Sequence, residues 1–417
     1  MQGRDVNVWI RTAIRHGGAN YSVAMARTLA IVSLALLGGI QLSGQSTSRS
    51  AYHDYRVVTY VDALVQPWSI AFLPGGDTLI TERPGRLRVV RNGKLLPNAV
   101  EGLPPVVHSS QGGLLEVVPH PNFAANRLLY FTYSKKIGEP ATPKDPVPAT
   151  TALIRGRFEN DRITDVQQLF QSVSAGRGHF GGKIAFDKNG FLFLTLGDRQ
   201  VPPEGKLEAH PAQDLSNHHG KMIRLHDDGR VPADNPFAKQ TGAKPEIWSY
   251  GHRNVQGLAI HPETGEVWAN EHGPQGGDEL NLIKPMVNYG WPVIGFGVNY
   301  TTGLAIHAGT HREGMQQPFQ VWVPSIGISG LMIYTGDKFP MWKGNFFVGG
   351  MVGQQVVRLT HDPKRGFTGR ELLATDLGRI RDIKQGLDGY IYLVTDDRDG
   401  KPTPVLRLEP VERQTSK

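Results

Sequence analysis

The chain has 417 residues, a formal net charge of +7 and no cysteine. Without cysteine it has no disulfide scaffold, no catalytic thiol and no thiolate metal site, so any metal must be held by oxygen atoms or by histidine. Residues 1–44 carry four arginines and one aspartate, which leaves a net charge of +4 on the rest, and no run of five Lys or Arg occurs. We therefore expect no nucleic-acid partner.

The first 44 residues have the pattern of a secretory signal. Arg27 precedes an apolar stretch over residues 29–40, and small residues follow it. This order is typical of a cleaved signal, and about 12 apolar residues are too few for a settled transmembrane helix. We expect residues 1–44 to be removed, whether translation begins at Met1 or at Met25. The mature protein is then periplasmic or secreted, without stable membrane insertion.

Six segments of the remaining chain follow one pattern. Each has an apolar strand, a tight turn with Pro, Asp or Gly, a second alternating strand and a polar end. This pattern is typical of a β-hairpin. Four copies are clear, at residues 69–90, 183–198, 257–273 and 383–400, and two are looser, at residues 114–134 and 331–359.

The six hairpins predict an all-β fold, a six-bladed β-propeller over residues 50–412. Helical patterning is nearly absent, and the 50 glycines and 29 prolines fit many tight turns. A pair of β-sandwiches is the alternative, but it would not repeat a similar hairpin six times. We expect residues 55–61 to pair with residues 405–408 and so to close the ring.

Polar residues occur where the predicted strands end. In a propeller, one set of strand ends faces a common mouth, so residues that are distant in the sequence can meet there. Arg379 and Arg381, two positions apart on a predicted strand, point to the same face. The candidates for a site at this mouth are Gln111, His179, Asp198, Arg253, Asn254, the loop 273–281, Arg379 and Arg381.

Several longer motifs occur along the chain in a fixed order: PWSIAFLPGGDTLITERPGRLRVV, GHFGGKIAF, EIWSYGHRNVQGLA, EHGPQGGDELNLI, NYGWP, PSIGISG and RIRDIKQGLDGYIYLVTDD. With them, residues 67–410 closely resemble the glucose/sorbosone dehydrogenase family. The resemblance implies a six-bladed quinoprotein that uses pyrroloquinoline quinone (PQQ) and calcium to oxidise the anomeric hydroxyl of aldose sugars to lactones. The short segment between NYGWP and PSIGISG is similar to the aldose sugar dehydrogenase branch.

The resemblance also implies roles for single residues. His179 matches the general base that takes the proton of the anomeric hydroxyl while hydride passes to the quinone, and a histidine suits this role because its pKa is near neutrality. Arg253 and Asn254 match the pair that contacts the quinone oxygens, where a fixed cation stabilises developing negative charge. The positions matched around the cofactor are Gln111, His179, Arg253, Asn254, Tyr300, Met351, Val352, Gly353, Arg379, Ile380, Arg381 and Asp382.

Calcium in the family is bound by backbone carbonyls and by the cofactor itself. The matching carbonyls here are those of Gly273 and Pro274, and such oxygen ligands suit a hard ion. Glu279 and the main chain near Tyr289 match a second calcium position. One departure is Val352, which stands where the glucose dehydrogenase branch has a cofactor-contacting lysine.

Two other functions are compatible with this sequence. A calcium-dependent lactonase on the same fold would need side-chain carboxylates that converge on one ion, whereas the motifs GHRN and RIRD are better explained by an anionic cofactor. A non-catalytic propeller that binds a partner or a polysaccharide would not need an intact His179 with Arg253 and Asn254. For the dehydrogenase, the expected partners are an aldose sugar and an external electron acceptor, and the expected state is a monomer or homodimer.

Overall fold

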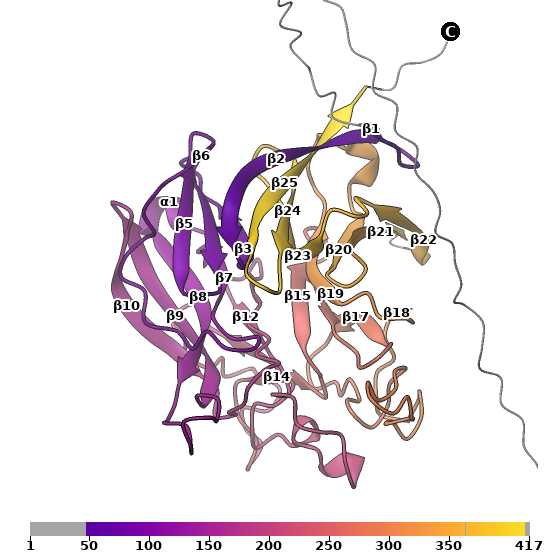
Figure 1. Ribbon diagram of the computed structural model, residues 1–417. Coiled ribbons are helices and arrows are strands. Elements are labelled where there is room, and N and C mark those ends of the chain that lie inside the picture. The colour runs from indigo at the N-terminus through magenta and orange to yellow at the C-terminus, as the bar shows by residue number, and fades with distance from the viewer. Residues whose placement is uncertain (1–46, 363, 413–417) are drawn as a thin grey trace, which may run out of the picture. The chain divides into compact units, whose positions relative to one another are not determined.

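The computed structural model describes residues 47–362 and 364–412, which form six antiparallel sheets arranged around an axis as a six-bladed β-propeller (Figure 1). The predicted fold is thereby confirmed. The predicted signal, residues 1–44, lies outside the described residues. No helix in the described part is long and apolar enough to cross a membrane.

The first three sheets follow the chain, each strand pairing with the next. The first comprises β3 (Pro67–Phe72), β4 (Thr78–Glu82), β5 (Arg86–Arg91) and β6 (Lys94–Leu95). The second comprises β7 (Leu114–Pro119), β8 (Leu128–Lys136), β9 (Ala149–Glu159) and β10 (Arg162–Gln171). The third comprises β11 (Ile184–Phe186), β12 (Leu192–Leu196), β13 (Lys221–Leu225) and β14 (Ile247–Tyr250).

The fourth and fifth sheets repeat this order, and the sixth also contains the beginning of the described chain. The fourth comprises β15 (Val255–Ile260), β16 (Val267–Glu271), β17 (Asp278–Ile283) and β18 (Gln320–Trp322). The fifth comprises β19 (Ile328–Ile333), β20 (Phe346–Gly350), β21 (Gln355–Asp362) and β22 (Gly366–Leu373). The sixth comprises β23 (Arg379–Gln385), β24 (Ile391–Asp396), β25 (Pro402–Val411), β2 (Asp54–Val65) and β1 (Thr47–Ser48).

Helix is confined to short turns between these strands. The described residues contain one helix of four residues, α1 (Phe123–Asn126), and the 3-10 turns η1 (Leu207–Ala209), η2 (Pro211–Gln213) and η3 (Pro340–Trp342). Each of the six predicted hairpins falls on the first two strands of a different sheet, so the repeat in the sequence is the blade of the propeller.

The ring is closed by strands from the two ends of the described chain. β2 pairs with β25, with Val57 opposite Leu408 and Val61 opposite Val405, as the sequence predicts. The innermost strands β3, β7, β11, β15, β19 and β23 are neighbours in this order around the axis, and β23 returns to β3. Their amino ends therefore meet around one opening.

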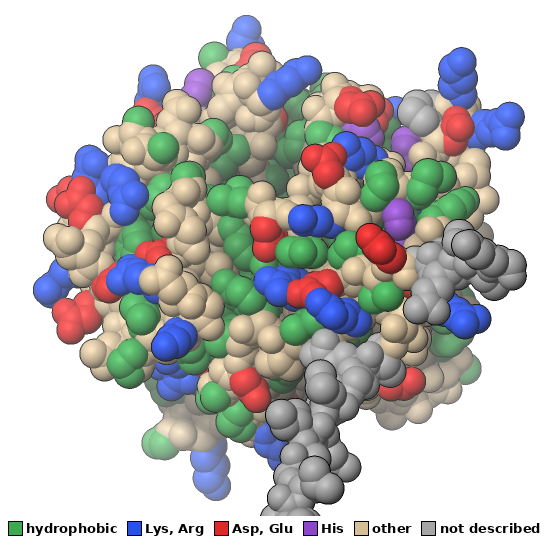
Figure 2. Space-filling view, turned by 90° about the horizontal axis from the view of Figure 1, so that it is seen from above, with side chains coloured by type: hydrophobic (Ala, Val, Ile, Leu, Met, Phe, Trp, Pro, Cys, Tyr) green, Lys and Arg blue, Asp and Glu red, His purple; other side chains and the backbone are tan. Residues whose placement is uncertain are grey.

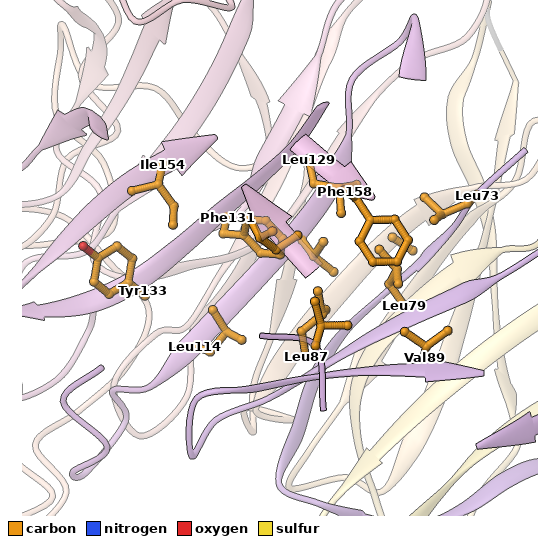
Figure 3. Close-up of a cluster of buried hydrophobic side chains, with 14 of the residues drawn as sticks. Leu73, Leu79, Leu87, Val89, Leu114, Leu129, Phe131, Tyr133, Ile154 and Phe158 are labelled. Atoms are coloured by element: carbon orange, nitrogen blue, oxygen red, sulfur yellow. The ribbon is translucent and has the colours of Figure 1, made fainter. Parts of the chain in front are cut away.

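Hydrophobic packing holds neighbouring sheets together, and each of the six interfaces between sheets has its own buried cluster. Figure 3 shows the cluster between the first two sheets, where aliphatic and aromatic side chains of both meet. The strands supply these side chains because alternate residues point to opposite faces of a sheet that is covered on both sides. The blades thus form a rigid support for the loops at their ends.

Charges of both signs are mixed on the surface of the propeller. On the face shown in Figure 2, Lys and Arg side chains lie beside Asp and Glu side chains over most of the described surface. Arg91 is an example of such pairing, 2.7 Å from Asp77 and 2.6 Å from Asp161. The described surface of this face therefore presents no extended patch of one sign.

Candidate functional site

A cavity of about 760 Å³ opens at the amino ends of the innermost strands. This volume is within the usual range for small-molecule sites. All six blades contribute to its lining, through Trp68 on β3, Leu115 on β7, Gly181 before β11, Gln256 on β15, Gly327 before β19 and Arg381 on β23. Residues from the whole length of the chain therefore meet here.

The cavity wall is cationic. Four arginines, Arg83, Arg379, Arg381 and Arg398, line it against two carboxylates, Asp278 and Asp396, which leaves an excess of two positive charges. Burial lowers the pKa of both Arg379 and Arg381, but a guanidinium keeps its charge at neutral pH. The Nε atoms of both are buried without a hydrogen-bond partner in the described part of the chain. The wall thus offers fixed, partly unused donors to an anionic ligand.

Arg381 is held rigidly on this wall. Its Nη1 donates to the Met351 sulfur at 3.1 Å, its Nη2 donates to Gln256 Oε1, and its guanidinium lies 4.8 Å from the centre of the Trp68 ring. Arg379 Nη2 also donates to the Met351 sulfur, at 3.4 Å. Both arginines line the cavity, as their spacing on one strand predicts.

A second cavity of about 230 Å³ adjoins the first, because Pro274 and Tyr300 line both. It is smaller, and its polar groups come from the segment before β11, the loops after β12 and β17, and the residues just before β15. The residues around it are His179, Asp198, Gln200, Val201, Pro202, Pro203, Arg253, Pro274, Trp291, Asn299, Tyr300 and Ile306. The fold brings His179 and Arg253 together on the second cavity, beside the large cavity and not within it.

His179 and Asp198 form a buried pair on this second cavity. Nδ1 of the imidazole lies 2.5 Å from Asp198 Oδ1, and the residues are 5% and 1% exposed. Asp198 Oδ2 accepts a hydrogen bond from Trp291 Nε1 at 2.7 Å. An ionised carboxylate only accepts hydrogen bonds, so the imidazole proton is on Nδ1. Nε2 is then an acceptor, without a partner among the described residues.

Electrostatics keeps His179 neutral. Burial lowers the pKa of His179, Asp198 raises it, and the net shift is downward, to which Arg253 contributes. Burial alone would raise the pKa of Asp198, but His179 and Arg253 hold it below its usual value. At neutral pH the pair is therefore a carboxylate and a neutral imidazole, whose Nε2 can accept a proton.

Arg253 contacts one of the two carbonyl oxygens that are candidates for a metal, that of Gly273. Its Nη1 donates to the carbonyls of Gly273 at 2.7 Å and His272 at 3.2 Å. Tyr300 donates to the Gly273 carbonyl at 3.4 Å, and Ser325 donates to the Pro274 carbonyl at 3.3 Å. Each carbonyl has two lone pairs, so a cation there would share the oxygen with these donors.

A third cavity, of about 20 Å³, lies beside the carboxylates of Glu271, which is buried, and of Glu279, which is partly exposed. Glu271 and Glu279 are opposite each other on β16 and β17, and Asn281 Nδ2 donates to both, at 3.4 and 3.2 Å. Burial and the neighbouring Glu271 raise the pKa of Glu279 to about 8. Tyr289 lines the same cavity, but its hydroxyl donates to the Leu282 carbonyl at 2.6 Å, so its main chain and not its hydroxyl is the candidate ligand.

Comparison with known proteins decides the family. The glucose/sorbosone dehydrogenase family matches residues 64–407. The chain belongs to this family. It is 40% identical to the aldose sugar dehydrogenase YliI of Escherichia coli strain K12 over 357 residues, which covers 84% of this chain and 91% of that protein.

Solved structures agree with this assignment. A crystal structure of a glucose dehydrogenase has 40% identity and a TM-score of 0.77, covering 86% of this chain and 99% of that one. The PQQ-bound form of the aldose sugar dehydrogenase from Streptomyces coelicolor has 25% identity and a TM-score of 0.66, covering 86% and 98%. This glucose/sorbosone dehydrogenase is thus an oxidoreductase that acts on a sugar CH–OH group, as the sequence predicts.

Some predicted site residues of this glucose/sorbosone dehydrogenase lie away from the cavities. Ile380 is in the hydrophobic cluster between the fifth and sixth sheets, because it points opposite to its arginine neighbours. Asp382 is 2.9 Å from Lys183 in the axis of the propeller. Val352 lines the large cavity, but the amide groups of Val352 and Gly353 already donate to the Ile326 carbonyl.

Other residues on the wall of the large cavity were not singled out from the sequence. Arg83 directly follows β4, and Asp396 and Arg398 lie at the end of β24, so these residues belong to the polar ends of their hairpins. The sequence therefore shows a polar residue at a hairpin end at each of these positions. Only the arrangement of the strands in a ring shows which of these ends face the cavity. Trp68 and Gln256 lie on innermost strands and carry no signal of this kind.

Proposed function

We propose that the protein oxidises the anomeric hydroxyl of an aldose to a lactone, with PQQ as the electron acceptor and calcium as a bound ion. The observation that carries the proposal is the neutral His179, whose free Nε2 faces a cavity that joins the arginine-lined one. A sugar beside His179 and a quinone in the large cavity would then share the boundary at Pro274 and Tyr300.

The large cavity fits an anionic cofactor. PQQ carries three carboxylates, and the guanidinium groups of Arg83, Arg379, Arg381 and Arg398 offer paired donors for such groups. The PQQ-bound relative from Streptomyces coelicolor supports the choice of this quinone. Asn254 also lines the cavity, and only its Oδ1 is used within the described residues, by Gln256 Nε2 at 3.1 Å and the Gly181 amide at 3.3 Å.

Four side chains carry the proposed chemistry. When bound, the quinone accepts the hydride from the anomeric carbon. His179 Nε2 takes the proton of the anomeric hydroxyl, and Asp198 stabilises the imidazolium that forms. Arg253, between the second and third cavities, provides a fixed positive charge near the developing negative charge. Tyr300, 65% exposed at the boundary, shields the reacting atoms from one side.

The carbonyls of Gly273 and Pro274 fit calcium only together with an anion. Arg253 already lies 2.7 Å from the Gly273 oxygen, so a second cation beside it would be repelled without a negative ligand between them. The carboxylates of PQQ are such ligands, and hard oxygen donors suit calcium. Calcium and the quinone should therefore bind at this position as a pair.

This proposal predicts how activity depends on cofactors. Treatment with a strong chelator should abolish aldose-dependent dye reduction, and only calcium and PQQ supplied together should restore it. A nicotinamide cofactor should not replace the quinone, because within residues 47–362 and 364–412 no glycine-rich turn joins a strand to a helix to hold its pyrophosphate. Dye reduction by a chelated, quinone-free sample would contradict the proposal. An aldose panel on the restored enzyme would then identify the sugar.

Glu279 is proposed as a ligand of a second calcium ion. Within the described part of the chain no three His, Cys, Asp or Glu side chains converge as a metal site, so the ion would depend on Glu279 with backbone oxygens near Tyr289. This also weighs against the lactonase, which needs several carboxylates on one ion. The adjacent carboxylates of Glu271 and Glu279 would repel each other when both are ionised, and a cation would relieve the repulsion.

Replacing Glu279 by glutamine tests this second position. Calcium should raise the thermal midpoint of the quinone-free wild type, and Glu279→Gln should remove that increase. The variant should itself be a few degrees more stable without calcium, since one of two adjacent carboxylates is gone. Differential scanning calorimetry measures both effects, and the exposed Glu263→Gln is the control. An unchanged calcium response in Glu279→Gln would show that the ion binds elsewhere.

A further inference from the structure

Three non-glycine residues beside the second cavity have a left-handed backbone. Their φ angles are +47° at His179, +60° at Arg199 and +61° at Gln200. Such residues seldom adopt this conformation, and the surrounding structure must hold them in it. The two segments are in direct contact, because a Cβ atom on Gly197 would lie 2.1 Å from the His179 carbonyl oxygen. The conformation of His179 therefore depends on the turn at residues 197–200.

Arg199 connects these two segments through hydrogen bonds. It is only 4% exposed, and its Nη1 donates to the carbonyl oxygens of His179 at 2.6 Å and Gly197 at 3.2 Å. Its Nη2 donates to Thr151 Oγ1 at 2.7 Å, and Thr151 Oγ1 donates to the Phe180 carbonyl at 2.6 Å. The two consecutive carbonyls at 179 and 180 are thus both fixed by this network.

Arg199 is a buried cation without an ion pair in the described part of the chain. The carboxylate of the neighbouring Asp198 is instead used by His179 Nδ1, the Gln200 amide and Trp291 Nε1. A buried charge is costly unless hydrogen bonds offset the loss of water. Arg199 Nε donates to the Ser174 carbonyl at 3.1 Å, while Nη1 contacts the segment that carries His179 directly and Nη2 contacts it through Thr151. Both terminal nitrogens of the guanidinium thus serve the geometry of the site.

His179 is consequently fixed at three points. Gln111 Oε1 accepts from its backbone amide at 2.8 Å, Arg199 donates to its carbonyl, and Asp198 accepts from its Nδ1. Gln111 thus contacts the base itself, although the resemblance assigns it to the cofactor. A base fixed in this way keeps Nε2 at one position relative to the sugar, and small displacements of a catalytic group are costly to the rate.

We propose that Arg199 is a positioning residue that holds His179 in its left-handed conformation and so aims Nε2 into the sugar cavity. This inference rests on the proposed role of His179 as the base. Arg199 lines neither cavity, so it acts through His179 and not on the quinone or the sugar.

The test uses Arg199→Gln in the full chain, with Arg199→Lys and Thr151→Val as milder changes. In quinone-free protein, the proton of the short His179–Asp198 bond should give a downfield NMR resonance that Arg199→Gln broadens or shifts. In reconstituted enzyme, Arg199→Gln should lower kcat about 10- to 100-fold, since a misplaced group costs up to about 100-fold. The dissociation constant for PQQ should stay within about twofold. Arg199→Lys and Thr151→Val should show smaller changes of the same kind.

Arg224→Gln is the matched control, because Arg224 is also buried but packs on Phe191 and Trp248, away from the cavities. It should lower stability while leaving the resonance and kcat unchanged. The positioning role is wrong if Arg199→Gln, like Arg224→Gln, leaves the resonance and kcat unchanged. If Arg199→Gln does not fold, the role is wrong when Thr151→Val and Arg199→Lys both leave the resonance and kcat unchanged. A wild-type rate in a His179 variant would instead overturn the base assignment, so the two failures are distinguishable.

Discussion

Replacement of His179 by glutamine should lower the rate at which a saturating aldose reduces the bound quinone by about 100- to 10,000-fold. Glutamine keeps much of the volume and one hydrogen bond but cannot accept a proton at neutral pH. The structure explains why no neighbour can take over this role: Asp198 is 1% exposed and its oxygens already accept from His179, Gln200 and Trp291. Single-turnover absorbance measurements on reconstituted protein give the rate directly.

Two variants separate the loss of the base from other effects. His179→Asn is the backbone control, because asparagine tolerates the left-handed conformation well and also lacks a base, so it should be equally slow. Arg253→Ala should weaken both PQQ binding and the rate, since its charge is proposed to act in ground and transition states. If His179→Gln reduces the quinone at the wild-type rate, the histidine is structural and the proposed mechanism is wrong.

The fold could be predicted from the sequence because the strands of each blade are close together along the chain. In the segment 69–90, the alternation and the turn predict two consecutive strands, and the structure has β3 and β4 there, followed by β5. The ring closure was predictable for a different reason. The apolar strand around residues 55–61 has no hairpin partner of its own, and the last blade needs one more strand, which β2 supplies beside β25.

The site was only partly predictable. Arg379 and Arg381 could be assigned to one face because their spacing on a strand determines it. The contact of Asp382 with Lys183 could not be predicted, since the two residues are 199 positions apart and meet only across the axis. The distribution of residues over three adjoining cavities also depends on the loops after β12 and β17, whose course has no periodic signal in the sequence.

The axis below the large cavity holds a group of four charges, of which Lys384 alone is partly exposed. Lys183 Nζ lies 2.8 Å from Glu116 and 2.9 Å from Asp382, and Lys384 lies 3.3 Å from Glu116. Burial would raise the pKa of Asp382, but Lys183 and Lys384 hold it below its usual value. Lys183 also lies 4.3 Å from the centre of the Trp68 ring, which lines the cavity. The group thus links three innermost strands to the cavity floor.

Replacing Lys183 by methionine should destabilise the protein by about 3–5 kcal/mol, because it leaves a buried Asp382 without a close cation. Urea unfolding at pH 7 measures the change, and Lys384→Met, whose side chain is 26% exposed, should cost less. The loss should shrink as the pH falls, since protonation of the unpaired carboxyl removes the buried charge. Adding Asp382→Asn to Lys183→Met should recover most of the stability. If the double variant is as unstable as Lys183→Met, the loss of stability comes from the packing of the lysine stem against Trp68. The unpaired carboxylate is then not its cause.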